Sequence, residues 1–254
     1  MSRRTLFIIQ LNSNMELHLF NNADELSASA AQWIADCISN TLQQQDRYTI
    51  VLSGGSTPKK LHMLLAAAPF KEQIDWSKLH IFWGDERAVP FDDVRNNARM
   101  AFDTLLNQVP IPRNQVHVMD TKLDPESAAS EYERILRRYF DETGPTFDLV
   151  LLGMGDDGHT LSLFPGKPII YEERKWAAAY FLREQNMFRI TLTAPVVNRS
   201  RKIAFLVAGA GKAHALKQVM EGDYRPDVYP SQVIKPEDGE VHWFLDKEAA
   251  ALLQ

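Results

Sequence analysis

The sequence has very little cysteine: Cys37 is the only one among 254 residues. A single thiol excludes an internal disulfide and a cysteine-rich metal site, and it favours a reducing, intracellular compartment. We therefore expect a cytoplasmic protein. Ile34 and Ile38 flank Cys37 at helical spacing, so the thiol is expected to pack inertly on the core face of a helix.

Long hydrophobic runs are also missing. A transmembrane helix needs about 20 apolar residues, and the sequence contains no such stretch. The apolar run at residues 6–9, which follows Arg3 and Arg4, is shorter than the core of a signal peptide. We expect neither a membrane span nor a secretion signal.

An excess of positive charge is absent too. The chain has 28 Lys and Arg against 33 Asp and Glu, which gives a net charge of −5. General nucleic-acid binding needs many basic side chains to displace counterions, so this balance disfavours it. A local basic pocket for a small anion is compatible with a mildly acidic surface. We expect no nucleic-acid, membrane or obligate protein partner.

Short β-rich runs alternate with helical patterns along the chain, which predicts βα units in a Rossmann-like, largely parallel sheet flanked by helices. Regular patterning begins at Met15, so residues 1–14 are expected to be an N-terminal extension outside the core, and residues 15–254 a single α/β domain. The expected strands cover residues 16–20, 48–52, 79–83, 116–119, 147–152, 176–181, 188–192, 203–208 and 241–245. The expected helices cover residues 23–44, 58–68, 98–106, 125–139, 212–220 and 247–253.

Four polar segments that contain glycine follow predicted strands. These strands end at Leu52, Trp83, Leu152 and Ala208. In open α/β sheets, ligands bind at the carboxyl ends of the strands, where loops meet helix N-termini. The four segments are therefore expected to form one site.

The first segment reads Ser-Gly-Gly-Ser-Thr-Pro and precedes a helix. Paired glycines let backbone N–H groups approach an anion, the hydroxyls add hydrogen bonds, and the helix dipole favours negative charge. The segment lacks the lysine and the spacing of a P-loop. A tight turn in which Ser or Thr only caps the helix is the alternative. The candidate phosphate-binding residues are Ser53, Gly54, Gly55, Ser56 and Thr57.

Charged side chains follow the other strands. Arg87 is suited to grip phosphate through its planar guanidinium, and Asp85 or Glu86 to take a proton or orient a sugar hydroxyl. An ordinary surface ion pair is the alternative. Lys212 lies near the first turn of a helix, where the dipole disfavours a cation unless an anion is bound, and Arg189 lies on a strand within reach of the same anion.

The segment from Gly153 to His159 contains three glycines within six residues, directly after the most hydrophobic strand. A histidine beside a carboxylate keeps the tautomer that takes a proton from water, so His159 with Asp157 is a candidate acid–base pair. A metal is not expected here, because no second histidine motif lies nearby in sequence. The other histidines are expected to be packed or surface side chains: His18, His62, His80, His117, His214 and His242.

The motifs together resemble the 6-phosphogluconolactonase family, in register from about Met15 to the C-terminus. They are the segments 53–58, 85–90, 153–166, 189–193, 211–213 and 243–250. The resemblance implies the glucosamine-6-phosphate isomerase-like fold and a hydrolase of 6-phospho-D-glucono-1,5-lactone in the oxidative pentose phosphate pathway, with no metal or cofactor. It implies catalysis by His159 with Asp157. It also implies phosphate recognition by the loop at residues 53–57 with Arg87, Lys212 and Arg189.

In the expected mechanism His159 activates a water that attacks the lactone carbonyl, and Asp157 stabilises the imidazolium. Ser162 lacks the Gly-x-Ser-x-Gly turn of a serine nucleophile. The chain departs from the family pattern at Asn96-Asn97, where Ser-Asn is usual, and at Leu161, where alanine is common. The resemblance therefore does not assign substrate contacts near Asn96.

Two other functions are compatible with parts of the sequence. Glucosamine-6-phosphate deaminase-isomerases resemble it in the Asp-Gly-His loop and at Asp85. They usually have a glutamate where Phe164 stands and a tyrosine where Arg87 stands. A non-catalytic sugar-phosphate sensor would carry a helix-turn-helix segment, which the short N-terminal extension is not expected to supply.

Overall fold

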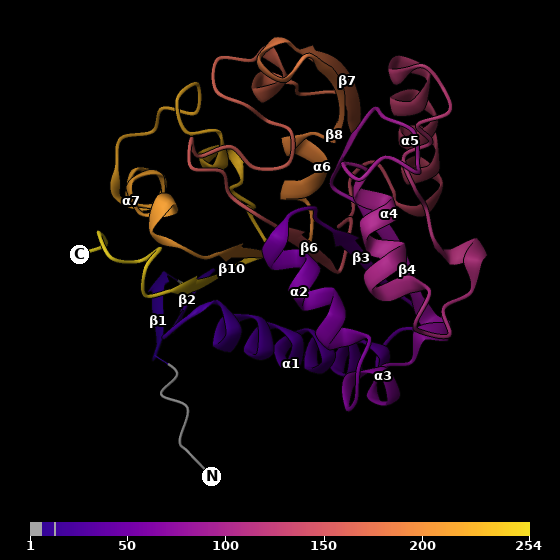
Figure 1. Cartoon of the computed structure of the whole chain (residues 1–254), viewed down its shortest axis with the longest axis horizontal. Helices are drawn as coiled ribbons and strands as arrows, with labels where there is room; N and C mark the ends of the chain where they lie inside the picture. Colours follow the sequence, from indigo (N-terminus) through magenta and orange to yellow (C-terminus); the bar gives the residue numbers. More distant parts are fainter. Residues whose placement is uncertain (1–6, 13) are drawn as a thin grey trace.

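The computed structural model describes residues 7–12 and 14–254. Its main sheet has seven strands in the order β1-β2-β10-β9-β6-β3-β4 (Figure 1). All neighbouring pairs are parallel except β1 and β2, so the predicted largely parallel sheet is confirmed. In sheet order, the strands are Phe7–Asn12, Met15–Phe20, Glu240–Asp246, Lys202–Val207, Leu149–Leu152, Tyr48–Leu52 and Leu79–Trp83.

Helices cover both faces of this sheet. On one face α1, α2 and the α4 segment form a core with Ile50 and Leu52, and on the other α5, α6 and α7 pack against the face that carries Val51. Because both faces are buried, the central strands are hydrophobic without alternation. The helices are α1 Ala23–Leu42, α2 Ser56–Leu65, α3 Phe70–Gln73, α4 Asn97–Ala101, α5 Pro125–Tyr139, α6 Ala194–Asn198 and α7 Ala213–Glu221.

Short helical turns connect these elements. The α4 helix continues as a π-helical segment, η2 Phe102–Leu106. The 3-10 turns are η1 Trp76–Lys78, η3 Arg113–Gln115, η4 Pro168–Tyr171, η5 Arg183–Gln185, η6 Ala210–Lys212 and η7 Pro230–Val233. No helix within residues 14–254 is long and apolar enough to cross a membrane.

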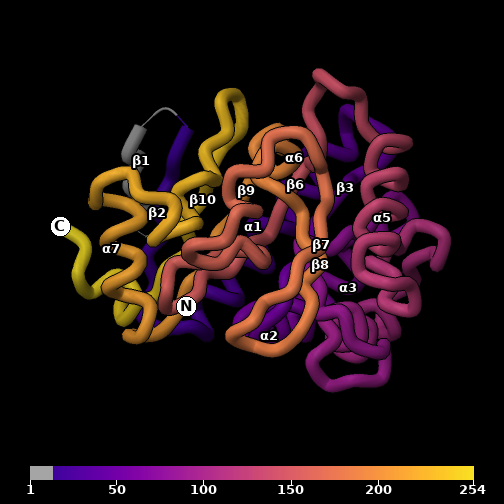
Figure 2. Tube along the Cα trace, turned by 90° about the horizontal axis from the view of Figure 1, so that it is seen from above, coloured from indigo at the N-terminus to yellow at the C-terminus, as the bar shows by residue number. Residues whose placement is uncertain are grey.

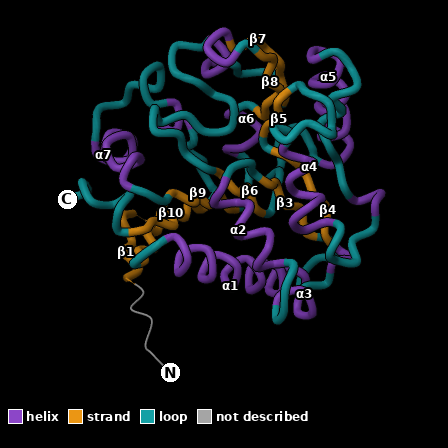
Figure 3. The backbone as a smooth tube through the Cα atoms, viewed as in Figure 1, coloured by secondary structure: helices purple, strands orange, loops and turns teal. Residues whose placement is uncertain are grey.

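A second, antiparallel sheet of order β5-β8-β7 lies on the side of the main sheet away from α1 (Figure 3). Its strands are β5 Asp85–Arg87, β8 Met187–Leu192 and β7 Ala177–Leu182. Gly84 joins the two sheets, because its N–H donates to Leu52 O of β3 at 3.0 Å and its carbonyl accepts from Leu192 N of β8 at 2.8 Å. The main-sheet strand β4 thus continues directly into β5.

Two predicted elements are wrong. Residues 116–119 form no strand, since only Val116 bridges to Ile81 before the segment leaves the outer edge of β4. Residues 247–253 form successive turns instead of a helix. The carboxylate of Asp246 accepts a hydrogen bond from Ala249 N in the first of these turns. It also accepts one from Gly209 N, so Asp246 connects this turn to the end of β9.

The N-terminal and C-terminal strands lie side by side at one edge of the main sheet (Figure 2). Strand β2 pairs in parallel with β10 over its whole length, and β1 pairs antiparallel with the outer side of β2. Residues 1–6 and 13, which belong to the predicted N-terminal extension, lie outside the described residues. The division at residues 14 and 15 stays a prediction.

His62 on α2 is fully buried. Its Nδ1 lies 3.3 Å from Thr104 Oγ1, and its Nε2 has no hydrogen-bond partner among the described residues. Burial lowers the pKa of His62 from 6.5 to about 4. The folded protein therefore holds this imidazole neutral, as expected for a packed histidine.

This burial predicts a pH dependence of stability. Between pH 6.5 and about 4 the unfolded chain protonates His62 while the folded chain does not, so the free energy of unfolding falls as the pH falls through this window. The variant His62→Gln should reduce that slope by up to about 1.4 kcal/mol per pH unit. Urea denaturation across the window measures it, with the exposed His214→Gln as the control. Equal slopes for His62→Gln and the native chain would contradict the assignment.

Candidate active site

The carboxyl ends of β3, β4, β6 and β9 meet at one pocket that encloses about 200 Å³. Its walls come from all four glycine-containing segments and from β8 of the second sheet. The lining residues are Ser53, Gly54, Gly55, Asp85, Arg87, Asn97, Gly153, Met154, Gly155, His159, Thr160, Leu161, Phe164, Arg189 and Lys212.

Most of the residues that the sequence singled out are brought together here. Four of them do not line the pocket, and one of these is Glu86, which contacts the start of α4. Ser56 and Thr57 belong to the first turn of α2, where Ser56 is exposed, and Asp157 stands outside the wall behind His159. Phosphate binding by the hydroxyls of residues 56 and 57 stays a prediction, since both residues lie at the start of α2, next to the lining residues 53–55.

His159 and Asp157 are in direct polar contact. His159 Nδ1 lies 2.5 Å from Asp157 Oδ1, and the same oxygen accepts from His159 N at 3.1 Å. Burial acts to raise the pKa of Asp157, but the hydrogen bond and the charge of His159 outweigh it, so the pKa is lowered. The ionised carboxylate fixes Nδ1 as the protonated nitrogen and leaves Nε2 with its lone pair.

The backbone of this loop makes room for the pair. A Cβ on Gly155 would lie 2.1 Å from His159 Nδ1 and 2.4 Å from Asp157 Oδ1, so only glycine permits their contact. Gly158 adopts a φ of 76°, and its carbonyl accepts from Ser231 N at 2.9 Å and Ser231 Oγ at 2.8 Å. Glycine tolerates this left-handed conformation. The loop is thus anchored to residues far along the chain.

Phe164 forms the next layer around the base. Its ring stacks on His159 with centroids 4.1 Å apart and an interplanar angle of 21°. The guanidinium carbon of Arg189 lies 5.6 Å from the centre of the same ring. Phe164 thereby holds the plane of the imidazole and contacts both His159 and Arg189.

Arg87 and Arg189 are direct partners across the β5–β8 ladder. Directly opposed side chains of antiparallel strands share one face, and like charges there are destabilising. Asp85, 3.8 Å from Arg189 Nη1, is the nearby carboxylate, and it also accepts a hydrogen bond from Ser162 Oγ at 2.6 Å. Ser162 therefore supports Asp85.

The two guanidinium groups have unused hydrogen-bond donors. Arg189 is 4% exposed, and the Nε atoms of Arg87 and Arg189 are buried without a partner among the described residues. Arg87 uses Nη1 to donate to Arg95 O at 2.7 Å, and Arg189 donates to Gln185 Oε1. Desolvation by burial lowers the pKa of Arg189. The charge of Asp85 raises this pKa, and the charge of Arg87 lowers it further. The pair is therefore suited to an anion.

Glu86 does not line the pocket and instead stabilises the surrounding backbone. Its buried carboxylate accepts from Asn97 N at 2.7 Å, Ala98 N at 2.8 Å and Arg87 N at 2.8 Å. Burial raises the pKa of Glu86 to about 7, against these three backbone hydrogen bonds, which lower it. Glu86 thus holds the start of α4 beside β5.

Asn97 is a pocket residue that the motifs did not assign. Its Nδ2 donates to Asp85 O at 2.9 Å, and its Oδ1 lies 2.0 Å from where a Cβ on Gly54 would be. The departure from the family pattern at Asn96-Asn97 was the signal that pointed to this segment. Asn96 itself is buried and caps α4 through Arg99 N at 2.8 Å.

Lys212 supplies a third cation. It stands at the N-cap of α7 and lines the pocket, and no hydrogen bond or ion pair joins its ammonium to the other described residues. No third metal-binding side chain gathers with Asp157 and His159 in residues 14–254. The donor set therefore offers a base and three cations.

A Rossmann-like sheet whose loops hold a histidine–carboxylate pair among three cations defines an enzyme of anionic small-molecule metabolism. The family model described as "Glucosamine-6-phosphate isomerases/6-phosphogluconolactonase" matches residues 21–243. The chain belongs to this family.

Three similar proteins carry the name 6-phosphogluconolactonase. The "6-phosphogluconolactonase" of Synechocystis sp. is 42% identical over 221 residues, which cover 85% of this chain and 89% of that protein. The rice protein "Probable 6-phosphogluconolactonase 4, chloroplastic" (Oryza sativa subsp. indica) is 38% identical, with 94% and 77% covered. The structure of 6-phosphogluconolactonase from Trypanosoma brucei superposes with a TM-score of 0.82 at 30% identity, with 94% of this chain and 98% of that chain covered.

The close approach at Gly155 gives a prediction. In Gly155→Ala the added methyl must displace His159 or Asp157, so the free energy of unfolding should fall by about 1–3 kcal/mol. Gly144→Ala is the matched control, because the nearest atom to its Cβ would be Asp141 Cβ at 3.8 Å, and it should change stability by less than about 0.5 kcal/mol. Urea denaturation measures both. Equal stability of the two variants would refute the required contact.

Proposed function

We propose that this protein hydrolyses 6-phospho-D-glucono-1,5-lactone to 6-phosphogluconate, a step of the oxidative pentose phosphate pathway. The observation that carries the proposal is the placement of His159, which is hydrogen-bonded to Asp157, in one pocket with Arg87, Arg189 and Lys212. The names of the relatives agree with it.

The phosphate is held at the end of the pocket formed by the two opposed arginines and the loop at residues 53–55. Arg87 and Arg189 offer unpaired donors in a planar arrangement that fits phosphate oxygens. The first turn of α2, which includes Ser56 and Thr57, adds free backbone N–H groups and its positive dipole end. Lys212 adds charge to the same pocket. This binding energy positions the lactone carbonyl.

His159 is the general base. Its Nδ1–H donates to Asp157, so Nε2 accepts a proton from water as the water oxygen attacks the lactone carbonyl. The ring C–O bond then breaks, and the proton passes from Nε2 to the leaving ring oxygen. Asp157 stabilises the imidazolium between these steps, since its pKa is lowered and it stays ionised. A lactone is an activated ester, so this minimal arrangement suffices without a covalent nucleophile.

The isomerase alternative is disfavoured by one contact. Phe164 occupies the position where deaminase-isomerases usually have a glutamate, and it covers the face of the His159 ring at 4.1 Å. No carboxylate besides Asp157 touches the imidazole among the described residues. Ring opening and aldose–ketose isomerisation need that further acid–base group.

A non-catalytic sensor is the other alternative function. A sugar-phosphate sensor would bind the substrate without turnover, so acid release in a pH-stat, corrected for spontaneous hydrolysis, separates it from an enzyme. A cytoplasmic location stays a prediction, and the rice relative is named as chloroplastic.

The base is tested by His159→Ala. Because His159 acts on the water and not on the phosphate, kcat should fall by about 10²–10⁴-fold while KM changes little. The control is His80→Gln, a change at a partly buried histidine of β4 that does not line the pocket. Steady-state acid release from freshly prepared lactone measures both. Native turnover in His159→Ala would remove His159 from the mechanism.

The anion site is tested by Arg87→Ala. Loss of charge-assisted hydrogen bonds to phosphate should raise KM for the phosphorylated lactone by about 10- to 100-fold. The rate with glucono-1,5-lactone, which lacks the phosphate, should stay unchanged. Arg113→Ala, which removes a surface guanidinium bound to Asn107, serves as the control. Equal losses on the two substrates would show that Arg87 does not bind phosphate.

A further inference from the structure

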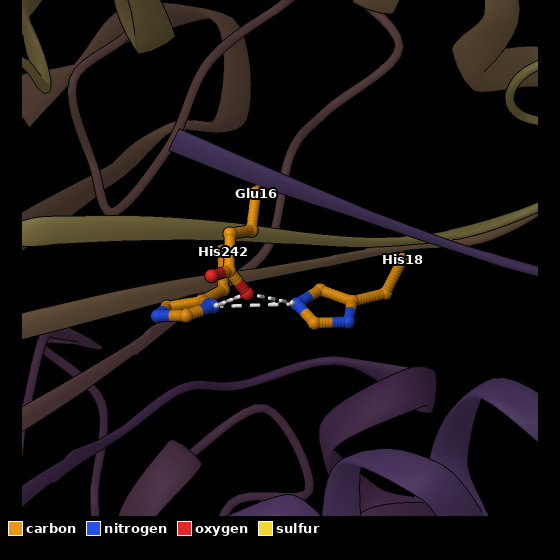
Figure 4. A group of neighbouring side chains, drawn as sticks. All are labelled: Glu16, His18 and His242. Carbon is orange, nitrogen blue, oxygen red and sulfur yellow. Dashed lines mark hydrogen bonds and ion pairs between the residues drawn. The ribbon is translucent and has the colours of Figure 1, made fainter. Parts of the chain in front are cut away.

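A second cluster of polar side chains lies at the edge of the main sheet, outside the pocket (Figure 4). It consists of Glu16 and His18 on β2 and His242 on β10. Glu16 and His242 are direct partners in the parallel ladder, and residues 16 and 18 of one strand share a face. This face packs against α1, since His242 lies 4.6 Å from the Trp33 ring.

Three ligand-type atoms of the cluster converge. His18 Nε2 lies 3.2 Å from His242 Nδ1, and Glu16 Oε2 lies 3.4 Å from His242 Nδ1 and 3.6 Å from His18 Nε2. Figure 4 shows the carboxylate and both rings directed at one another. Each atom therefore approaches both of the others.

Hydrogen bonds satisfy only part of this triangle, because a neutral His18 can donate from Nε2 to His242 Nδ1 or to Glu16, but the side between His242 Nδ1 and Glu16 depends on the tautomer of His242. His242 Nε2 lies 3.2 Å from Glu240 Oε2, and this contact places the proton of a neutral His242 on Nε2. His242 Nδ1 and the Glu16 carboxylate then meet with lone pairs at 3.4 Å. A cation at the centre of the triangle turns this repulsion into attraction.

The size of the triangle fits a particular kind of cation. Zinc binds imidazole nitrogen and carboxylate oxygen at about 2.0–2.2 Å in tetrahedral geometry, which separates neighbouring ligand atoms by about 3.3–3.5 Å. The three observed separations, 3.2, 3.4 and 3.6 Å, span this value. Two imidazoles with one carboxylate also match the ligand preference of zinc and related divalent ions.

The surroundings hold the ligands in place. Glu240, which orients His242, is itself paired with Lys202, and such a carboxylate behind a ligating histidine fixes its tautomer. His18 stacks on Phe244 with centroids 4.5 Å apart. Both histidine side chains are 5% exposed, whereas that of Glu16 is 41% exposed, so an ion and one water can enter from the side of Glu16.

We propose that Glu16, His18 and His242 bind a divalent transition-metal ion of the zinc type, with a water as fourth ligand. The ion joins β2 to β10, and so fastens the first parallel strand to the last. None of its ligands lines the substrate pocket. The site is therefore separate from lactone hydrolysis and serves the fold.

The test uses the full-length protein after chelator treatment and dialysis. Calorimetric titration with Zn²⁺ alone should show one ion per chain with an accompanying rise in the melting temperature, because the ion binds only the folded chain. Co²⁺ should give the visible absorption of a tetrahedral site. His242→Gln and Glu16→Gln should lower the affinity for Zn²⁺ more than about 100-fold, and Glu240→Gln about 10- to 100-fold.

Control variants separate this site from other histidines. His80→Gln alters a histidine that neighbours His117 and Tyr139 without a carboxylate ligand, so it should keep native Zn²⁺ affinity. His159→Asn should also keep it, because His159 belongs to the pocket. Retained lactone hydrolysis and far-ultraviolet circular dichroism establish that Glu16→Gln and His242→Gln fold. Absence of stoichiometric binding, binding that survives His242→Gln, or loss of binding in His159→Asn would each overturn the proposal.

Discussion

The repulsion between Arg87 and Arg189 is the constraint around which the pocket is built. Two guanidinium groups face one another on adjacent strands, and Asp85 at 3.8 Å from Arg189 is their nearby counter-charge. Glu86 is next to Asp85 in sequence, but its carboxylate accepts hydrogen bonds from the backbone of α4. The folded chain therefore keeps positive charge in a buried place where an anion relieves it. This departure from the local rules of strand pairing is expected of a functional site and agrees with the proposed anion-binding role of the two arginines.

The proposed catalytic pair is assembled in a different way. Asp157 and His159 are separated by one residue, so their contact is made within a single turn and needs only the backbone room that Gly155 leaves. The arginines come instead from strands about a hundred residues apart in sequence. A local contact thus forms the proposed base, and long-range strand pairing forms the proposed anion site. The main sheet brings them together because its loops emerge at one edge.

The division between local and long-range contacts also explains what the sequence could predict. Continuous apolar strands and glycine-rich loops predicted the parallel sheet and the meeting of its four loops. Strand β5 was not foreseen, since Asp85, Glu86 and Arg87 have no strand pattern and pair only because β8 lies beside them. Asn97 enters the pocket through its fit over Gly54, which no periodicity encodes. The triangle of Glu16, His18 and His242 depends on the pairing of the first and last strands of the parallel sheet.

Gly84 has a consequence for substrate choice. Its peptide groups tie β3 to β8, and a side chain there would strike Leu161, 2.6 Å away, in the loop that follows His159. Gly84 therefore joins the sheet that carries Arg189 to β3, and it leaves room for the loop that follows His159. Under the proposed function, these main-chain bonds help to set the separation between the phosphate and the ester of the substrate, so sugar acids of another chain length would fit less well.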